Sequence, residues 1–131
     1  MFLTRECDYA IRTIRGLADM KVRAVGIICE HEQIPPAFTY KILKKLEKAK
    51  IVSSSRGARG GYKLLKDLDT ITLYDIIIAI DDRLFINECL LHDYKCPHNT
   101  DGNHCGIHVE MERLQNVLMD ALREKTMAEL V

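Results

Sequence analysis

The 131-residue sequence has no run of about 18 to 20 uncharged apolar residues, the length that a membrane-spanning helix needs. Its opening, MFLTRECDYAIR, carries acidic residues where a secretory signal would have its apolar core. It has neither a nucleophile-elbow motif nor a Gly-rich phosphate loop. We therefore expect a cytoplasmic protein that has no membrane segment and is not an enzyme.

Five cysteines are an odd number for a chain without a secretion signal, so a disulfide framework is a poor interpretation. Free thiols, metal ligands or redox sensors explain them better. Since 47% of the residues are apolar, the chain can bury one compact core and carry a small appended element. The composition thus predicts a small globular protein with cysteine chemistry.

The formal net charge is zero, but the charges are unevenly distributed. Residues 36–66 contain nine basic residues and Glu47 alone as an acid, a net charge of +8. Residues 67–131 contain five basic and thirteen acidic residues, a net charge of −8. A localised basic block in a neutral protein is typical of a polyanion-binding surface, although a solvated helix face has the same composition. The predicted shape of the block decides between these two interpretations.

Apolar periodicity predicts helices in the first half of the chain. Residues 3–18 carry an apolar stripe with helical spacing, and Thr4 is placed to cap that helix. A short apolar run over 25–29 precedes Ile34-Pro35-Pro36, where the prolines end one helix and begin the next. This is the layout of a helix-turn-helix.

The helix predicted over residues 36–49 has one apolar and one cationic face. The apolar arc is expected to consist of Phe38, Ile42, Leu46 and Ala49. The opposite side carries Ala37, Tyr40, Lys41, Lys44, Lys45 and Lys48. Such a helix fits the major groove of double-stranded DNA, where lysines neutralise phosphates and side chains near the N-terminal end reach base edges. We expect it to be a recognition helix.

Residues 51–65 predict a β-wing beside this helix, with two short strands joined by a Gly-rich basic turn. Such a turn brings backbone and arginine close to the adjacent minor groove. The wing residues expected to contact DNA are Arg56, Arg59, Gly60 and Gly61. Thr72 and Asp75 predict the capped start of a further helix. The fold class is therefore mainly α with a small β-wing, a winged helix-turn-helix domain over residues 1–80.

Residues 81–106 have no periodicity and form a loop too long to be a simple connector. From Ile107 an apolar stripe resumes, which predicts a C-terminal helical segment over 107–131 without a partner in its own chain. The loop and the helix start contain Cys89, Cys96, Cys105 and His108. Three thiolates and an imidazole suit an iron–sulfur cluster or tetrahedral zinc. The missing short Cys–Cys hook favours a cluster, and thiols that bind nothing are the third possibility.

Three segments, LTRECDYAIRTIRGLA, IPPAFTYKILKKLEKAKIVSSSRGARGGYKL and ITLYDIIIAID, resemble the Rrf2 family of bacterial transcription regulators. The similarity covers nearly the whole chain. It implies a sequence-specific regulator, a repressor by preference, that forms a homodimer through the helix near 107–125 and binds a roughly twofold-symmetric operator. Arg56 matches the family's wing arginine, whereas Ala37 and Tyr40 depart from residues of IscR-like members, so the operator sequence is not carried over. Lys50 stands where the family commonly has glycine, which predicts a left-handed backbone.

The resemblance also implies a role for the loop. IscR- and NsrR-like members carry a cluster on three cysteines there, which implies sensing of iron–sulfur, redox or nitric oxide status; the longer gaps between the cysteines leave nuclearity open, with 2Fe–2S favoured over 4Fe–4S. For the fourth ligand, His108 matches IscR-like members, Asp8 matches an NsrR-like aspartate that reaches across the dimer, and Glu6 is a weaker donor. Cys7 and Cys29 are expected in the core. CymR-like members imply an alternative, a cluster-free regulator controlled by a partner protein or a metabolite.

Overall fold

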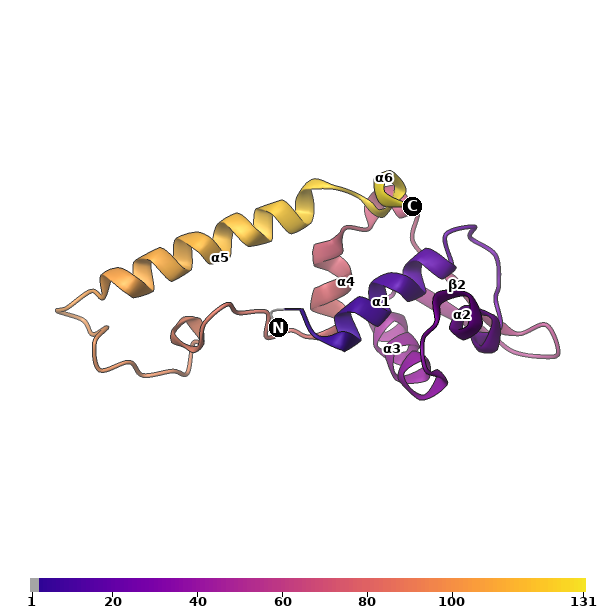
Figure 1. Ribbon diagram of the computed structural model, residues 1–131, viewed down its shortest axis with the longest axis horizontal. Coiled ribbons are helices and arrows are strands. Elements are labelled where there is room, and N and C mark those ends of the chain that lie inside the picture. Colours follow the sequence, from indigo (N-terminus) through magenta and orange to yellow (C-terminus); the bar gives the residue numbers. More distant parts are fainter. Residues whose placement is uncertain (1–2) are drawn as a thin grey trace.

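The computed structural model describes residues 3–131, which form a mainly helical structure with one two-stranded sheet (Figure 1). The elements in chain order are α1 (Arg5–Gly16), α2 (Val25–Glu32), α3 (Pro36–Lys48), β1 (Val52–Ser55), β2 (Gly61–Leu64), the 3-10 turn η1 (Leu68–Thr70), α4 (Leu73–Ile80), the 3-10 turn η2 (Glu88–Leu90), α5 (Gly106–Glu124) and α6 (Met127–Leu130). The predicted fold class, a winged helix with an additional C-terminal helix, is confirmed.

Side chains at the helix ends explain where the helices begin and end. The Thr4 hydroxyl accepts a hydrogen bond from the backbone N–H of Cys7 and so caps α1, as predicted. Thr72 and Asp75 form the predicted capping box of α4. After α3, Lys50 has a φ of 58°, which confirms the predicted left-handed conformation and ends the helix before β1.

The core lies where α1 packs against α2, α3 and α4. The largest fully buried apolar side chains are Ile14, Leu17, Ile28, Ile42, Leu43, Leu46, Ile51, Ile71, Ile76, Ile77, Met127 and Val52. Cys7 and Cys29 are buried in the same core, as predicted, and the Cys29 thiol donates to the Thr39 hydroxyl at 3.2 Å. This core holds α2 and α3 in a fixed relation to each other and to the wing.

The apolar arc of α3 differs from the prediction at its edge. Phe38, expected in the core, is 42% exposed and lies edge-on against the Tyr9 ring. Thr39 and Leu43 are buried in its place, next to Ile42 and Leu46. A threonine is stable in this position because its hydroxyl donates to the Pro35 carbonyl, so no polar atom is left without a partner.

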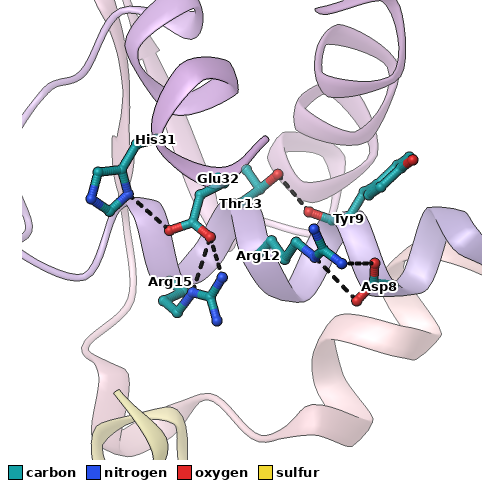
Figure 2. A network of polar contacts seen from close by, with 7 residues as sticks. All are labelled: Asp8, Tyr9, Arg12, Thr13, Arg15, His31 and Glu32. Atoms are coloured by element: carbon teal, nitrogen blue, oxygen red, sulfur yellow. Dashed lines mark hydrogen bonds and ion pairs between the residues drawn. The ribbon is translucent and has the colours of Figure 1, made fainter. Parts of the chain in front are cut away.

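A buried carboxylate fastens α2 to α1 (Figure 2). The Glu32 side chain is 2% exposed and accepts hydrogen bonds from Arg15 Nε at 3.0 Å and from His31 Nδ1 at 3.2 Å. Burial pushes the pKa of Glu32 upward, but the hydrogen bonds from Arg15 and His31 outweigh burial, and the net pKa is lowered. Gly16 leaves room for this side chain, since a Cβ there would lie 3.0 Å from Glu32 Cγ.

The C-terminal segment leaves the core and then returns to it. The loop of residues 81–105 leads away from the other helices, and α5 then leads back toward them (Figure 1). Thr126 and Glu129 form the capping box of the short helix α6. There Met127 is buried in the core, and its backbone N–H donates to the Ile71 carbonyl at 2.7 Å. The C-terminal end of α5 is thereby connected to the core, whereas its N-terminal end lies far from α4 (Figure 1).

Candidate functional site

The exposed side of α3 carries Ala37, Tyr40, Lys44 and Lys48, as the sequence predicts. Lys44 and Lys48 make no side-chain hydrogen bond or ion pair within residues 3–131. Their ammonium groups are therefore available to a negatively charged partner. We call the exposed side of α3 together with the turn 56–60 the basic face.

Two further lysines of α3 are engaged within the chain. Glu6, in the first turn of α1, forms ion pairs with Lys41 and Lys45. Lys45 Nζ lies 2.8 Å from Glu6 Oε2 and also donates to the Ile80 carbonyl at 2.9 Å, and its side chain is 35% exposed. These lysines lower the pKa of Glu6 by hydrogen bonding and charge. Both lysines lie on the predicted side of α3, and Lys45 is the less exposed of the two.

The wing is held against α3 by the one acidic residue of the basic block. Strands β1 and β2 are antiparallel, with Val52 opposite Leu64 and Ser55 opposite Gly61. Glu47 of α3 accepts hydrogen bonds from the backbone N–H of Ser54 at 3.1 Å and from its hydroxyl at 2.6 Å. Glu47 thus fixes the position of the wing, a role that no sequence signal indicated.

The turn of the wing presents Arg56 and Arg59, both of them exposed. Gly60 and Gly61, predicted as DNA contacts, have a structural reason to be glycine. A Cβ at Gly60 would lie 2.4 Å from the Ser55 carbonyl oxygen, and one at Gly61 would lie 2.0 Å from the Arg23 carbonyl oxygen. The α1–α2 loop approaches here because the backbones of Arg23 and Tyr62 exchange hydrogen bonds of 2.8 and 2.9 Å.

Three free thiols and the imidazoles of His98, His104 and His108 line a single pocket between the long loop and the start of α5. Its volume is about 580 Å³, and Cys89, Cys96, Cys105 and His108 are among its lining residues. The three cysteines are partly buried. His108 Nδ1 is buried and has no hydrogen-bond partner among residues 3–131. We call this the cysteine pocket.

The cysteine pocket contains sulfur and nitrogen donors. Within residues 3–131, no three His, Cys, Asp or Glu side chains converge as ligands of a single metal ion, so a preformed tetrahedral zinc site is absent from this part of the chain. Three thiols and an unpartnered imidazole nitrogen are among the lining groups, and these are donor types that iron–sulfur clusters use. The residues therefore fit a cluster by their chemistry and by their common pocket.

The two acidic candidates for the fourth ligand lie on α1. The Asp8 carboxylate pairs with Arg12 at 2.9 Å (Figure 2), and Glu6 pairs with lysines of α3. Neither residue is among those that line the cysteine pocket of its own chain. His108 is among them, so it is the candidate that the structure brings next to the cysteines.

Sequence reasoning missed Gln115, the buried residue at the centre of α5. Its Nε2 donates to the Leu84 carbonyl at 2.7 Å, and its Oε1 accepts from the Ile86 N–H at 2.9 Å. These bonds fasten the start of the loop to α5. Because both partners are backbone groups of a non-periodic segment, no sequence pattern marks the contact.

Comparison with known proteins assigns the family. Residues 3–131 match the Rrf2 family, described as "Iron-dependent Transcriptional regulator". The chain belongs to the Rrf2 family. This Rrf2 regulator is 34% identical to a helix-turn-helix transcriptional regulator of Aquifex aeolicus, over all of this chain and 92% of the relative. It is 28% identical to the regulator IscR of Vibrio vulnificus, over all of this chain and 77% of that protein.

Solved structures of the family share the fold of this Rrf2 regulator. IscR of T. potens superposes with a TM-score of 0.73 at 21% identity, covering 97% of this chain and 83% of that one. CymR, the global cysteine regulator of B. subtilis, superposes with a TM-score of 0.74 at 22% identity, covering 97% and 93%. The relatives are transcriptional regulators and not enzymes, in agreement with the sequence prediction. Within residues 3–131 no helix has the length and apolar character needed to span a membrane.

Proposed function

We propose that this Rrf2 regulator is a cytoplasmic repressor that binds operator DNA with α3 in the major groove and the wing against the adjacent minor groove. The observation that carries the proposal is the basic face, which combines the exposed Tyr40, Lys44 and Lys48 of α3 with the exposed wing arginine Arg56. Lysines along α3 neutralise phosphates, and residues near its N-terminal end reach base edges. Arg56 inserts into or beside the minor groove.

A second copy of the chain is the proposed partner of α5. One side of α5 contacts the core through Met119 and Leu122. The other side leaves large apolar side chains in solvent, with Ile107 at 67% and Val117 at 54% exposure. An exposed apolar stripe on a long helix is typical of an interface, and a twofold dimer presents two recognition helices to a roughly twofold-symmetric operator.

The cysteine pocket is the proposed sensor. Cys89, Cys96 and Cys105 would hold an iron–sulfur cluster, with His108 as the fourth ligand and Asp8 of a second copy as the alternative. A bound cluster, 2Fe–2S by preference, supplies a reversible response to iron–sulfur, redox or nitric oxide status. The unpartnered Nδ1 of His108 and the shared pocket support this assignment.

The chain offers two physical links between the sensor and the DNA-binding region. Gln115 ties the start of the loop to α5, and Lys45 ties α3 to Ile80, the last residue of α4 before the loop. If a bound group ordered the loop, the positions of α5 and α3 would change together. The spacing between the two recognition helices of a dimer would then change as well. A coupling free energy of about 1–3 kcal/mol suffices for a switch of about 5- to 150-fold.

The DNA-binding proposal is tested with Lys44→Ala, because Lys44 is exposed and unpaired within the described residues. Binding to a random duplex and to a duplex selected by the protein from a random library is measured over a range of salt concentrations. We expect weaker binding to both duplexes and a salt slope shallower by about one unit, since one phosphate contact is lost. An unchanged slope would exclude Lys44 from the interface.

The sensor proposal has its own readout. Protein prepared without oxygen should show visible absorbance and contain iron and acid-labile sulfide. A colourless preparation with one tightly bound zinc per chain would show that the bound group is zinc and not a cluster. A colourless preparation without metal would favour the cluster-free alternative, in which a partner protein or a metabolite controls the dimer.

A further inference from the structure

Glu6 is the acidic residue that contacts the lysines of α3. One of its carboxylate oxygens pairs with Lys41 and the other with Lys45. We infer that Glu6 acts as a built-in competitor of the DNA phosphates, which holds Lys41 and Lys45 back from random-sequence DNA and so raises discrimination in favour of the operator. This inference rests on the proposed DNA-binding function.

The position of Glu6 is fixed by α1. It lies in the first turn of that helix, where the helix dipole favours a carboxylate, and Thr4 caps the same turn. Lys45 is held from a second direction, since it also donates to the Ile80 carbonyl. The pairs therefore join α3 to two other parts of the core, and the lysines do not need DNA to satisfy their charges.

The two ion pairs of Glu6 are weak enough for DNA phosphates to displace them. Partly exposed ion pairs are weak, and two of them shift an equilibrium by about 2- to 20-fold in total. Sequence-independent affinity for DNA is set by the number of phosphates that basic side chains neutralise. A protein whose Lys41 and Lys45 stay with Glu6 therefore loses two phosphate contacts on random DNA.

The complex with the operator differs from the complex with random DNA because base contacts fix the depth of α3 in the groove. Tyr40 is exposed one residue before Lys41, on the side that would meet base edges. Once such contacts hold the helix, phosphates approach Lys41 and Lys45 closely enough to replace Glu6. On random DNA those base contacts are missing, so the internal pairs persist.

The test compares Glu6→Gln, which removes the charge and keeps the side-chain length, with Glu124→Gln. Glu124 is exposed at the end of α5, so this control makes the same charge change far from α3. We expect Glu6→Gln to bind the random duplex about 2- to 20-fold more tightly at low salt, with a salt slope steeper by about one to two units. Affinity for the selected duplex should rise less, so the ratio of the two affinities should fall. Glu124→Gln should match the wild type.

Lys41→Ala on its own keeps the inference testable if Glu6→Gln alters folding, and the two substitutions together complete a double-mutant cycle. In the wild type, Lys41→Ala should change the affinity for the random duplex by less than about twofold. In the Glu6→Gln background, it should make the salt slope shallower by about one unit, because one phosphate contact is lost. Equal effects of Lys41→Ala in both backgrounds, equal gains on both duplexes, or the same gain from Glu124→Gln would overturn the inference. If Lys44→Ala weakens binding as expected but Glu6→Gln behaves as the wild type, this inference fails and the proposed function stands. If the wild type binds neither duplex, both fail.

Discussion

Between α1 and α4 the buried apolar side chains form one continuous core, whereas in residues 81–105 Leu84 alone is buried. The first region consists of helices and a sheet, and the second contains only the 3-10 turn η2 as regular structure. The first region therefore gains its shape from packing. The second is fastened mainly at its start, by Gln115, and at its end, where α5 begins.

This difference suggests how the two regions work. A packed region keeps the recognition helix in one geometry, which sequence-specific binding requires. A loop with little buried surface opens at low free-energy cost, so a bound group is able to change its order. Substitutions in the first region should therefore lower the free energy of unfolding. Substitutions in the second region should instead weaken the retention of the bound group.

The largest expected effect concerns the loop. Cys96→Ala should abolish the visible absorbance of protein prepared without oxygen, because an iron that lacks one thiolate is open to solvent and oxygen. The matched control is Cys29→Ala, which removes a buried core thiol that is remote from the loop and should leave the absorbance intact. Equal absorbance in both variants would exclude Cys96 as a ligand.

The fourth ligand gives a finer version of the same test. If His108 is the ligand, His108→Ala should shift the visible spectrum or shorten the cluster's lifetime, and Asp8→Ala should do neither. The opposite result would assign the position to Asp8 of a second copy. Both variants should still dimerise, since the exposed apolar stripe of α5 is unchanged.

The next effect is on stability and compares leucines of the two regions. Leu43→Ala removes a fully buried side chain of α3 and should lower the free energy of unfolding by about 2–5 kcal/mol. Leu91→Ala, in the loop, should change it by about 0.5 kcal/mol or less, because Leu91 is partly exposed. Denaturant titration followed by circular dichroism measures both. Similar losses would show that the loop packs as tightly as the core.

Arg56→Ala tests the wing. It should weaken binding to the selected duplex by about 1–3 kcal/mol and affect the random duplex much less, because Arg56 is proposed to read bases or groove width. Fluorescence anisotropy with both duplexes gives the two changes, and Lys44→Ala serves as the comparison for a phosphate contact. An equal loss on both duplexes would reduce Arg56 to a phosphate contact as well.

The smallest effect concerns pH. The folded-state pKa of Glu32 lies below its ordinary value of 4.5, so ionised Glu32 stabilises the fold above that pH. This contribution is lost as the pH falls through the folded-state pKa. Glu32→Gln should therefore be less stable than the wild type at pH 7, with a difference that shrinks on acidification. Thermal melts between pH 7 and pH 3 measure it. A difference that stays constant with pH would contradict the lowered pKa.

Much of the DNA-binding region was predictable because its signals are local. Caps at Thr4 and Thr72, the prolines before α3 and the glycine-rich wing turn each act over a few residues. The burial of Thr39 instead of Phe38 was not predictable, because it depends on a hydrogen bond to Pro35 and on space beside Tyr9.

Contacts between distant segments escaped the sequence analysis. Glu6 and Lys45 are 39 positions apart, and Gln115 binds backbone groups about 30 positions away. The cysteines indicated which ligand chemistry to expect. Because the gaps between them are longer than in the related regulators that they resemble, the relative positions of the thiols were not predictable. A segment with few buried side chains has no packing pattern from which the positions of its cysteines could be predicted.

The central claim is that the cysteine loop controls the DNA-binding region. It is tested most directly by measuring, without oxygen, the affinity of the same preparation for the selected duplex before and after the bound cluster is removed by chelation. We expect the two dissociation constants to differ by about 5- to 150-fold. Identical dissociation constants for a preparation that had contained iron and sulfide would contradict it.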